Sequence, residues 1–369
     1  MFGAVLFSVV TLMHVYVFWR AASVPFVKRH VSRKFLFGTG FVMWTVFSIG
    51  RFFGHGSTGV LAGMLELAGM DWMAAIFLTT ISFLTVDVVT VFGLIMRGIA
   101  PALRGMALAA GVVLSVISLI QGMRPPVVQE YEVRLPGLHR EMDGTVLIAM
   151  SDLHIGTILG KEWLEARVAQ VQAQHPDLVV LLGDIFEGHG EPSEGLLRVM
   201  HRLSAPLGVW GVLGNHEFHG RDSASSPMIN IDGVRVLSNT WQEVRPGLVL
   251  AGVDDLTRNH RSGLGGDPVS KALEGRPAGA TVFLSHTPWQ AEKAADLGTG
   301  LMLSGHTHGG QIWPFGYLTR RVYPLLAGRY EVNGMTVIVC RGTGTWGPRM
   351  RLWRPGEILR ITLHPEGKG

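Results

Sequence analysis

Aspartate, asparagine and histidine residues recur in five short motifs along the later two thirds of this 369-residue chain. In order, the motifs are Ser-Asp-Leu-His, Gly-Asp-Ile-Phe-Glu, Gly-Asn-His-Glu, Ser-His-Thr-Pro and Gly-His-Thr-His-Gly-Gly-Gln. Their candidate ligands are Asp152, His154, Asp184, Asn215, His286, His306 and His308. Oxygen and imidazole ligands suit hard-to-borderline divalent metal ions. The residue types therefore predict a metal site.

Each motif directly follows an apolar run that is typical of a buried strand. We expect strands at 145–150, 177–182, 208–213, 248–253, 281–284, 301–303, 336–340 and 358–363, with helices at 163–174 and 196–203. This alternation indicates an α/β domain, in which ligands bind beyond the carboxyl ends of the strands. One motif alone is weak evidence, since a lone histidine or a glycine after a strand is usually a turn residue. Their joint occurrence at strand ends favours a single shared site.

The motif series resembles the calcineurin-like metallophosphoesterase superfamily. The matching residues are Asp152-x-His154, Gly183-Asp184-x-x-Glu187, Gly214-Asn215-His216-Glu217, His286 and Gly305-His306-x-His308. The extended run Gly-His-Thr-His-Gly-Gly-Gln is similar to the bacterial membrane-associated or exported branch. The resemblance covers about residues 144–363 and implies a four-layer αββα sandwich. Glu187 stands where many members have aspartate, at a position that is not usually a ligand.

The resemblance also implies roles for these residues. It implies two divalent metal ions, for which Mn, Fe, Zn and Co all suit the nitrogen and oxygen ligands. One ion would be bound by Asp152, His154 and His308, the other by Asn215, His286 and His306, with Asp184 bridging them. Such a pair clamps phosphoryl oxygens and yields a bridging hydroxide nucleophile. His216 would act on the leaving group as an acid or transition-state donor, and Glu217 would either orient it or be an exposed loop acid.

Other residues near the motifs leave two interpretations open. His189 and His219 are either solvated loop residues or contacts to substrate phosphate, and Asp254 and Asp255 are expected to shape a loop. The run Ile-Trp-Pro-Phe-Gly-Tyr-Leu at 312–318 follows the last histidines directly. It is either an ordinary packed loop or an apolar lip that lies on a bilayer and admits a lipid tail.

The first third of the chain contains four stretches that are nearly free of charge. They cover 1–19, 35–50, 72–96 and 105–123. About 20 apolar residues cross the hydrocarbon core of a bilayer, and the second stretch needs Phe52 and Phe53 to reach that length. A signal peptide is a poor alternative for the first, because no Lys or Arg precedes it. Pro125 and Pro126 end the fourth helix, so we expect a transmembrane domain at 1–124 and a phosphoesterase domain at 125–369.

The charges of the connecting loops predict the orientation in the membrane. The first loop is basic, the second acidic and the third basic, through Lys28, Arg29, Arg33 and Lys34, then Glu66 and Asp71, then Arg97 and Arg104. Loops one and three are expected in the cytoplasm, which places the catalytic domain on the extracytoplasmic side. Asp87 and His14 lie within expected spans, where a polar residue forms either a contact between helices or part of a functional site.

The composition excludes several other classes of protein. Hydrophobic residues make up 47% and charged residues 16% of the chain, which is unusual for a soluble enzyme. Nine Lys/Arg and three Asp/Glu lie up to Arg124, against 23 and 25 in the remainder. The basic excess thus belongs to the apolar third, and no nucleic-acid partner is expected. The single cysteine, Cys340, excludes a disulfide framework and is expected to be a small buried apolar residue.

We therefore predict a membrane-anchored, dinuclear metal-dependent phosphoesterase. Its expected substrate is a phosphodiester or pyrophosphate carried by a lipid or nucleotide-linked lipid, so its partners are this phosphate ester and the lipid bilayer. The alternative is an extracytoplasmic hydrolase of soluble nucleotides or cell-wall phosphates, with the helices acting only as an anchor. A third hypothesis, a non-catalytic transporter or sensor, is disfavoured because all the expected ligands and His216 are present.

Overall fold

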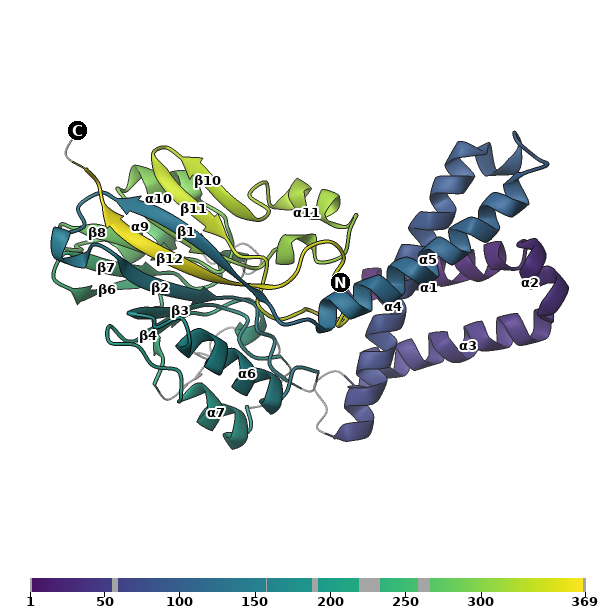
Figure 1. The fold of residues 1–369 in the computed structure, drawn as a ribbon, viewed down its shortest axis with the longest axis horizontal. Coiled ribbons are helices and arrows are strands. Elements are labelled where there is room, and N and C mark those ends of the chain that lie inside the picture. Colours follow the sequence, from purple (N-terminus) through teal and green to yellow (C-terminus); the bar gives the residue numbers. More distant parts are fainter. Residues whose placement is uncertain are drawn as a thin grey trace. The chain divides into compact units, whose positions relative to one another are not determined.

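The computed structural model describes residues 2–54, 59–156, 158–187, 192–218, 233–257 and 266–367. The chain forms two compact units. A helical unit comprises Met1–Arg124 and Gly347–Trp353, and a second unit comprises Pro125–Trp346 and Arg354–Gly369. Figure 1 shows the helices of the first unit in purple to blue and the strands and helices of the second in blue to yellow.

Four long apolar helices make up most of the helical unit: α1 (Phe2–Ala21), α3 (Arg33–Ile49), α4 (Val60–Val89) and α5 (Ala100–Met123). Shorter elements connect them, namely α2 (Pro25–His30), the π-helical η1 (Gly50–Gly54) and the 3-10 turn η2 (Val91–Gly93). All four long helices, the second together with η1, have the length and hydropathy needed to cross a membrane. The prediction of four apolar helices is confirmed.

The third helix differs from its predicted range. Helix α4 begins at Val60, not at residue 72, and ends at Val89. Glu66 and Asp71, which we expected in the second loop, therefore lie on the helix, where Glu66 is buried and Asp71 accepts a hydrogen bond from the backbone N–H of Arg349 at 2.7 Å. The prediction was wrong because it started the span only after Glu66 and Asp71. An acid whose charge has a partner inside the protein need not interrupt a helix.

Asp87 joins three of these helices through buried polar contacts. Its carboxylate lies 2.6 Å from Arg20 Nε and 3.3 Å from Arg104 Nη2, and it accepts a hydrogen bond from the Tyr16 hydroxyl at 2.6 Å. Arg104 was expected in the third loop, but it lies on α5 and is buried. The partners come from α1 and α5, so Asp87 acts as an interhelical contact, as one of the two interpretations held.

Two further features bring helices of this unit close together. His14 Nε2 lies 2.9 Å from the carbonyl oxygen of Gly40 on α3, and Trp72 Nε1 of α4 donates to His14 Nδ1 at 3.3 Å. A Cβ atom on Gly69 of α4 would lie 3.0 Å from Cα of Phe47 on α3. Small residues and interhelical hydrogen bonds are how membrane helices associate, and they place His14 in a structural role.

The second unit contains two six-stranded sheets. The first has the order β1 (Val127–Leu135), β12 (Glu357–Pro365), β2 (Thr145–Met150), β3 (Leu178–Leu182), β4 (Val209–Val212) and β5 (Arg235–Val236). The second has the order β10 (Gly328–Val332), β11 (Met335–Val339), β9 (Leu301–Ser304), β8 (Ala280–Leu284), β7 (Leu248–Gly252) and β6 (Thr240–Arg245). The strands β2 to β5 are mutually parallel, as are β7, β8, β9 and β11. Parallel strands of this kind need cover on both faces.

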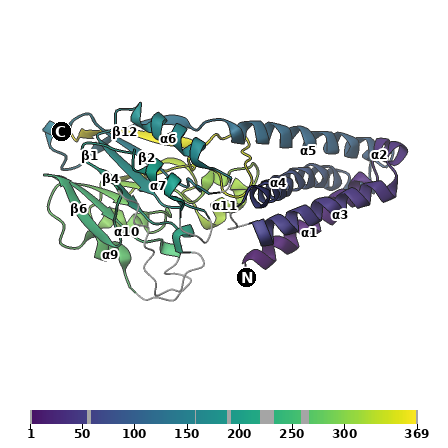
Figure 2. The ribbon, with the colours of Figure 1, turned by 90° about the horizontal axis from the view of Figure 1, so that it is seen from below.

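Helices cover the outer faces of both sheets, which gives the expected αββα sandwich (Figures 1 and 2). Leu147 and Ala149 of β2 lie in the core between the sheets, whereas Ile148 and Met150 pack toward α6 (Lys161–Gln172) and α7 (Glu194–Met200). The alternation follows from the two-residue period of a strand. Helices α9 (Pro268–Leu273) and α10 (Ala291–Asp296) pack in the same way on the second sheet. Cys340 is buried in the central core, as expected.

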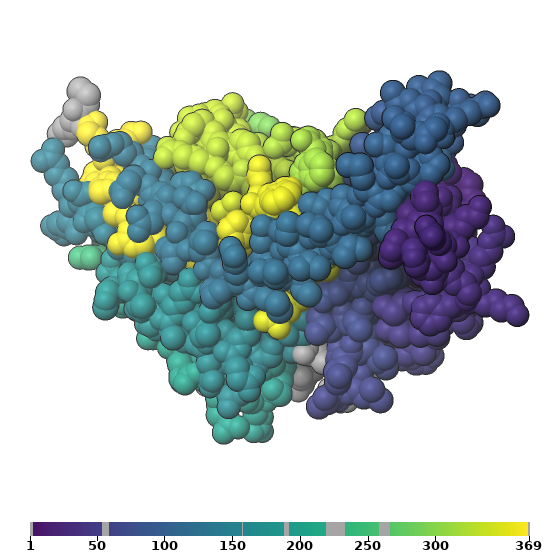
Figure 3. Space-filling view, turned by 45° about the vertical axis from the view of Figure 1, so that its right-hand side comes forward, coloured from purple at the N-terminus to yellow at the C-terminus, as the bar shows by residue number. Residues whose placement is uncertain are grey.

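Every predicted strand and helix of this unit is found, with ends shifted by a few residues. The strands that sequence patterning missed are β1, β5, β6 and β10, together with the short helices α9, α10 and α11 (Gly316–Val322) and the turns η3 (Arg140–Met142), η4 (His216–Phe218) and η5 (His308–Gly310). Strand β1 carries polar residues at many positions and is stabilised by parallel pairing with β12, more than two hundred residues away. Figure 3 shows yellow C-terminal residues interleaved with blue ones at the left of the view.

Candidate metal centre

The parallel strands of both sheets deliver the predicted site residues from their carboxyl ends. Asp152 and His154 follow β2, Asp184 follows β3, and Asn215 and His216 follow β4. From the other sheet, His286 follows β8, and His306 and His308 follow β9. Because each stretch of chain leaves its sheet at the same edge, the polar side chains gather at one place. The structure brings all the expected ligands together.

Three donor atoms form a first group. His308 Nε2 lies 3.1 Å from His154 Nε2 and 3.3 Å from Asp152 Oδ1. All three side chains are buried. These atoms lie within 4.8 Å of one another, close enough for one metal ion to be bound by all of them.

A second group forms around His286 Nε2. This nitrogen lies 3.0 Å from His306 Nδ1, 3.2 Å from Asn215 Oδ1 and 3.2 Å from Asp184 Oδ2. The same oxygen of Asp184 lies 3.8 Å from His154 Nε2, which belongs to the first group. Asp184 therefore stands between the two groups.

The electrostatics of the cluster favour a bound cation. Burial alone would raise the pKa of Asp184, but the neighbouring His286 and His216 hold it well below its ordinary value. Burial alone would lower the pKa of His286, yet the charges of Asp184 and Asp152 raise it well above the usual range. In a buried site, positive charge nearby stabilises carboxylates of this kind. Their nitrogen and oxygen donors fit divalent transition metals.

The backbone at the cluster adopts an uncommon conformation. Positive φ angles occur at Asp152 (52°), His154 (46°), Asp184 (51°), His306 (69°) and His308 (49°). A non-glycine residue with positive φ is uncommon, and each costs on the order of 1–3 kcal/mol. Five such residues in one cluster are retained because surrounding contacts hold them, and such strain concentrates at functional sites.

Two glycines allow the strands to approach this closely. A Cβ atom on Gly214 would lie 2.2 Å from Asp184 Oδ1, and one on Gly305 would lie 1.7 Å from Ser151 Oγ. Neither glycine has a positive φ, whereas Gly183 does, at 87°. The turn conformation we expected for glycines beside the ligands thus holds at Gly183. At Gly214 and Gly305 the requirement is space for a neighbouring side chain.

Three candidate ligand histidines are oriented by a hydrogen bond to the ring nitrogen that faces away from the cluster. His154 Nδ1 donates to Glu187 Oε2 at 2.6 Å, and His286 Nδ1 donates to the Leu182 carbonyl at 2.8 Å. His306 Nε2 lies 2.7 Å from the Tyr323 hydroxyl. A neutral imidazole that uses one nitrogen in this way leaves the other as a lone-pair donor, and such partners orient metal-binding histidines.

Glu187 and Tyr323 contact candidate site residues, and sequence reasoning assigned neither of them a role there. Glu187 was expected only not to be a ligand, and its carboxylate contacts both His154 and, at 3.1 Å, His216 Nδ1. Its spacing from Asp184 was the available signal. Tyr323 lies outside every motif and had no signal in the sequence, because only the folded chain places it beside His306.

Glu217 differs from both of its expected roles. It is neither an exposed loop acid nor a hydrogen-bond partner of the His216 ring. It is buried, and its carboxylate accepts hydrogen bonds from the backbone N–H groups of Asp184, Ile185 and Gly214 at 2.7–2.9 Å. Burial and the nearby charge of Asp184 raise the pKa of Glu217 to about 7. Glu217 thus fastens the turn after β4 to the turn after β3.

His216 lies at the edge of the cluster. Its Nδ1 faces Glu187, and its Nε2 lies 3.9 Å from Asp184 Oδ2. Burial alone would lower the pKa of His216, but Asp184 and Glu187 raise it to about 9. Its ring nitrogens also lie close enough to His154 and Asp184 for these three to hold a metal ion. His189 and His219 lie outside the described residues.

Asp254 accepts hydrogen bonds from Ser238 and Asn239, both at 2.8 Å, in agreement with a loop-shaping role.

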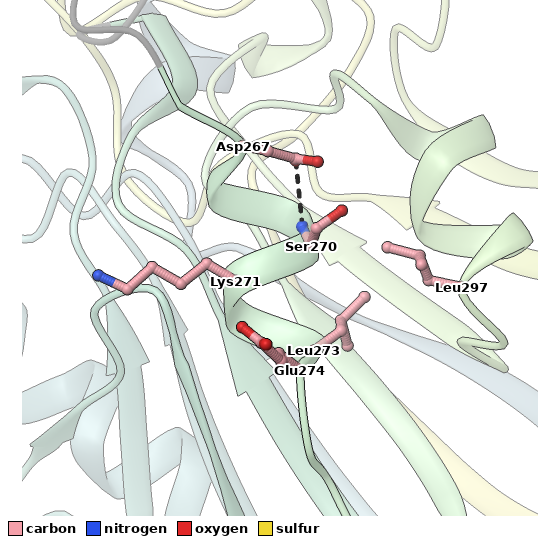
Figure 4. Close-up of a pocket in the computed structure, with 6 residues that line it drawn as sticks. All are labelled: Asp267, Ser270, Lys271, Leu273, Glu274 and Leu297. Atoms are coloured by element: carbon pink, nitrogen blue, oxygen red, sulfur yellow. Dashed lines mark hydrogen bonds between the residues drawn. The ribbon is translucent and has the colours of Figure 1, made fainter.

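A cavity of about 470 Å³ lies beside α9 and is lined by Asp267, Ser270, Lys271, Leu273, Glu274 and Leu297 (Figure 4). Its polar residues serve the helix, since Asp267 accepts from the backbone N–H of Ser270 at 3.1 Å. None of these lining residues belongs to the metal cluster.

Comparison with known proteins agrees with the geometry. Residues 145–310 match the family model of calcineurin-like phosphoesterases. A metallophosphoesterase of Aquifex aeolicus is 32% identical over 248 residues, covering 66% of this chain and 92% of that protein. A bovine transmembrane protein with a metallophosphoesterase domain is 34% identical over 280 residues, covering 71% of this chain and 63% of that protein. The match therefore spans less than two thirds of the bovine relative. The five motifs, the αββα fold and these relatives together show that the chain belongs to the calcineurin-like metallophosphoesterase family.

Proposed function

We propose that this protein is a membrane-anchored hydrolase that uses two divalent metal ions to cleave a phosphodiester or pyrophosphate bond. The observation that carries the proposal is the pair of donor groups that share Asp184, one around His308 and one around His286. A single structural ion would need one such group. Two groups on either side of one carboxylate favour a dinuclear centre.

The residues would divide between the ions as follows: Asp152, His154 and His308 for one, and Asn215, His286 and His306 for the other, with Asp184 shared. Mn, Fe, Zn and Co all suit this set of nitrogen and oxygen donors. Bound ions of this kind supply Lewis acidity to phosphoryl oxygens and to the attacking water. The contacts that maintain the strained backbone at the ligands would also position these donors before any ion binds.

His216 is our proposed proton donor to the leaving group. Glu187 accepts the hydrogen bond from His216 Nδ1, so the ring presents Nε2 toward Asp184 and the centre of the cluster. A positioned acid of this kind raises rates by about 10²–10⁴-fold. Glu187 also fixes His154, so one carboxylate aligns a proposed ligand and the proposed acid.

We propose a substrate that is itself held in the membrane, because a chain with four apolar helices then has its site near its substrate. The experiment compares the full-length protein in nanodiscs on lipid-linked pyrophosphates and on soluble nucleotides, with metal content measured on the same samples. Asp184→Asn should lose most metal and activity together, whereas Asp254→Asn, an aspartate that shapes a loop, should retain both. A wild-type content of one ion or none would contradict the dinuclear proposal, and a preference for soluble nucleotides would favour the alternative substrate class.

The proposed location of the second unit is the extracytoplasmic side. Four basic residues lie between or beside the ends of α1 and α3, namely Lys28, Arg29, Arg33 and Lys34. Of the two basic residues expected between α4 and α5, Arg104 pairs with Asp87, so Arg97 is the one that contributes to the charge of this connection. The first connection therefore carries most of the positive-inside signal. A C-terminal tag should be digested by protease added to spheroplasts, and full protection would show the opposite orientation.

A further inference from the structure

Exposed apolar side chains of the second unit are concentrated in one segment. Among its described residues, six large hydrophobic side chains are exposed. One is Val127, and the other five lie within a stretch of ten residues: Trp313, Phe315, Tyr317, Leu318 and Val322. Tyr317 is 68% exposed and Leu318 62%. We call residues 313–322 the apolar segment. Large apolar patches on the surface of a domain mark interaction sites, and such a concentration of exposed apolar residues is a candidate for one.

The apolar segment is anchored at both ends, but its helix presents its side chains outward. Ile312 before it and Leu326 after it are buried. Helix α11, which forms most of the segment, has no buried residue. A helix of a globular domain normally buries one apolar face against the core. The apolar side chains of α11 therefore remain available for something outside this unit.

The charges around the segment indicate what covers it. No Asp or Glu occurs between Gly305 and Tyr330, whereas Arg320 and Arg321 lie in the last turn of α11 and are exposed. Tryptophan and tyrosine rings are enriched at the membrane–water interface, and arginines beside them attract anionic headgroups. The chain also carries four helices suited to a bilayer, so a lipid surface is always within reach.

We propose that the apolar segment docks into the interfacial region of an anionic lipid bilayer. The aromatic and aliphatic side chains enter the boundary between headgroups and acyl chains, while Arg320 and Arg321 bind lipid phosphates. A surface element of this kind inserts by about 5–10 Å. The occupant is the bilayer itself, not a second protein.

The same segment is fastened to the candidate metal centre. A Cβ atom on Gly310, just after His308, would lie 2.2 Å from Cα of Gly316 at the start of α11. At the other end of α11, Tyr323 contacts His306 Nε2 at 2.7 Å. Docking therefore holds the metal-binding loop next to lipid headgroups. This last step rests on the proposed function, whereas docking itself does not.

A fluorescent label tests docking without any enzymatic readout. Cys340 is the single cysteine and is buried, so Leu318→Cys introduces one reactive thiol for an NBD probe. The full-length protein is placed in nanodiscs that contain phosphatidylglycerol and doxyl-labelled lipids. Lys271→Cys, exposed on α9, is the matched control. We expect a blue-shifted, doxyl-quenched signal at position 318 and neither effect at position 271.

Other outcomes of the labelling overturn the proposal. Equal emission and quenching at both positions would show that the segment stays in water. A blue shift at position 318 without doxyl quenching would show that protein, not lipid, covers the segment. The unsubstituted chain, carried through the same labelling, measures any reaction of Cys340.

A kinetic experiment connects docking to the proposed function. The Tyr317→Ser, Leu318→Ser double variant should raise the KM for a vesicle-borne ester by roughly tenfold relative to the KM for a soluble nitrophenyl ester. Equal changes for both esters would contradict a docking role. If the chain labelled at position 318 is quenched by doxyl lipid yet the wild-type protein hydrolyses neither ester, the proposed function fails while docking is supported.

Discussion

Replacing Tyr323 with phenylalanine tests how the candidate metal centre is oriented. The change removes only the phenolic oxygen, which lies 2.7 Å from His306 Nε2, and keeps the ring that stacks on Trp289 at 5.4 Å. Without this oxygen, His306 loses the partner that directs its Nδ1 toward His286. We therefore expect His306 to bind a metal ion less tightly.

The magnitude follows from the burial of the two side chains. Removing the hydrogen-bond partner of a metal-binding histidine costs about 10- to 100-fold in affinity, or about 1.4–2.7 kcal/mol. His306 and Tyr323 are only partly buried, so water can replace part of the lost bond. We expect a loss of about tenfold, or about 1.4 kcal/mol, at the ion bound by His306.

The assay is a calorimetric titration of the metal-depleted full-length protein with Mn²⁺ or Zn²⁺. Tyr330→Phe is the matched control, because the Tyr330 hydroxyl binds the backbone N–H groups of Leu326 and Ala327 and contacts no candidate ligand. Wild-type affinity in Tyr323→Phe would refute the orienting role. Equal losses in both variants would show that the hydroxyls act only through the stability of the surrounding loop.

Three further variants test the proposed acid His216, the buried contact of Asp87 between helices, and the turn that Glu217 fastens. His216→Ala should keep its metal content and slow hydrolysis of esters with poor leaving groups by about 10²–10⁴-fold, with a much smaller effect on nitrophenyl esters; equal losses in kcat/KM would indicate that His216 stabilises phosphoryl charge instead. Asp87→Ala should destabilise the helical unit by about 3–5 kcal/mol in denaturant titrations, since it leaves Arg20 and Arg104 buried without their carboxylate; wild-type stability would contradict this contact. Glu217→Gln should lower the free energy of unfolding by roughly 1–3 kcal/mol, because an amide presents N–H groups where the backbone needs acceptors; an unchanged unfolding midpoint would argue against the fastening role.

Local patterns in the sequence were sufficient for the ligand motifs and the central strands. The run at 145–150 could be predicted as a strand because it is almost wholly apolar. It is apolar because the strand is buried on both faces. The carboxyl ends of parallel strands lie at one edge of a sheet, so residues that follow such strands are candidates for a shared site. For this reason Asp152 and Asp184 could be assigned to one cluster before their distances were known. The same local logic identified four apolar helices.

Contacts between distant residues decided the remainder, because no local pattern encodes them. Glu66 and Asp71 of α4 were assigned to a loop, since a charge is unexpected in a membrane span until its partner is known. Strand β1 has mixed polarity, and its pairing with β12 and the burial of its last residues in the core depend on distant parts of the chain. The tertiary structure also turned Glu217 inward to accept from four backbone N–H groups and brought Tyr323 to His306. The sequence by itself determined which side chains could bind metal, and the fold decided which residues hold those side chains in position, because orientation depends on hydrogen bonds between segments that meet only in three dimensions.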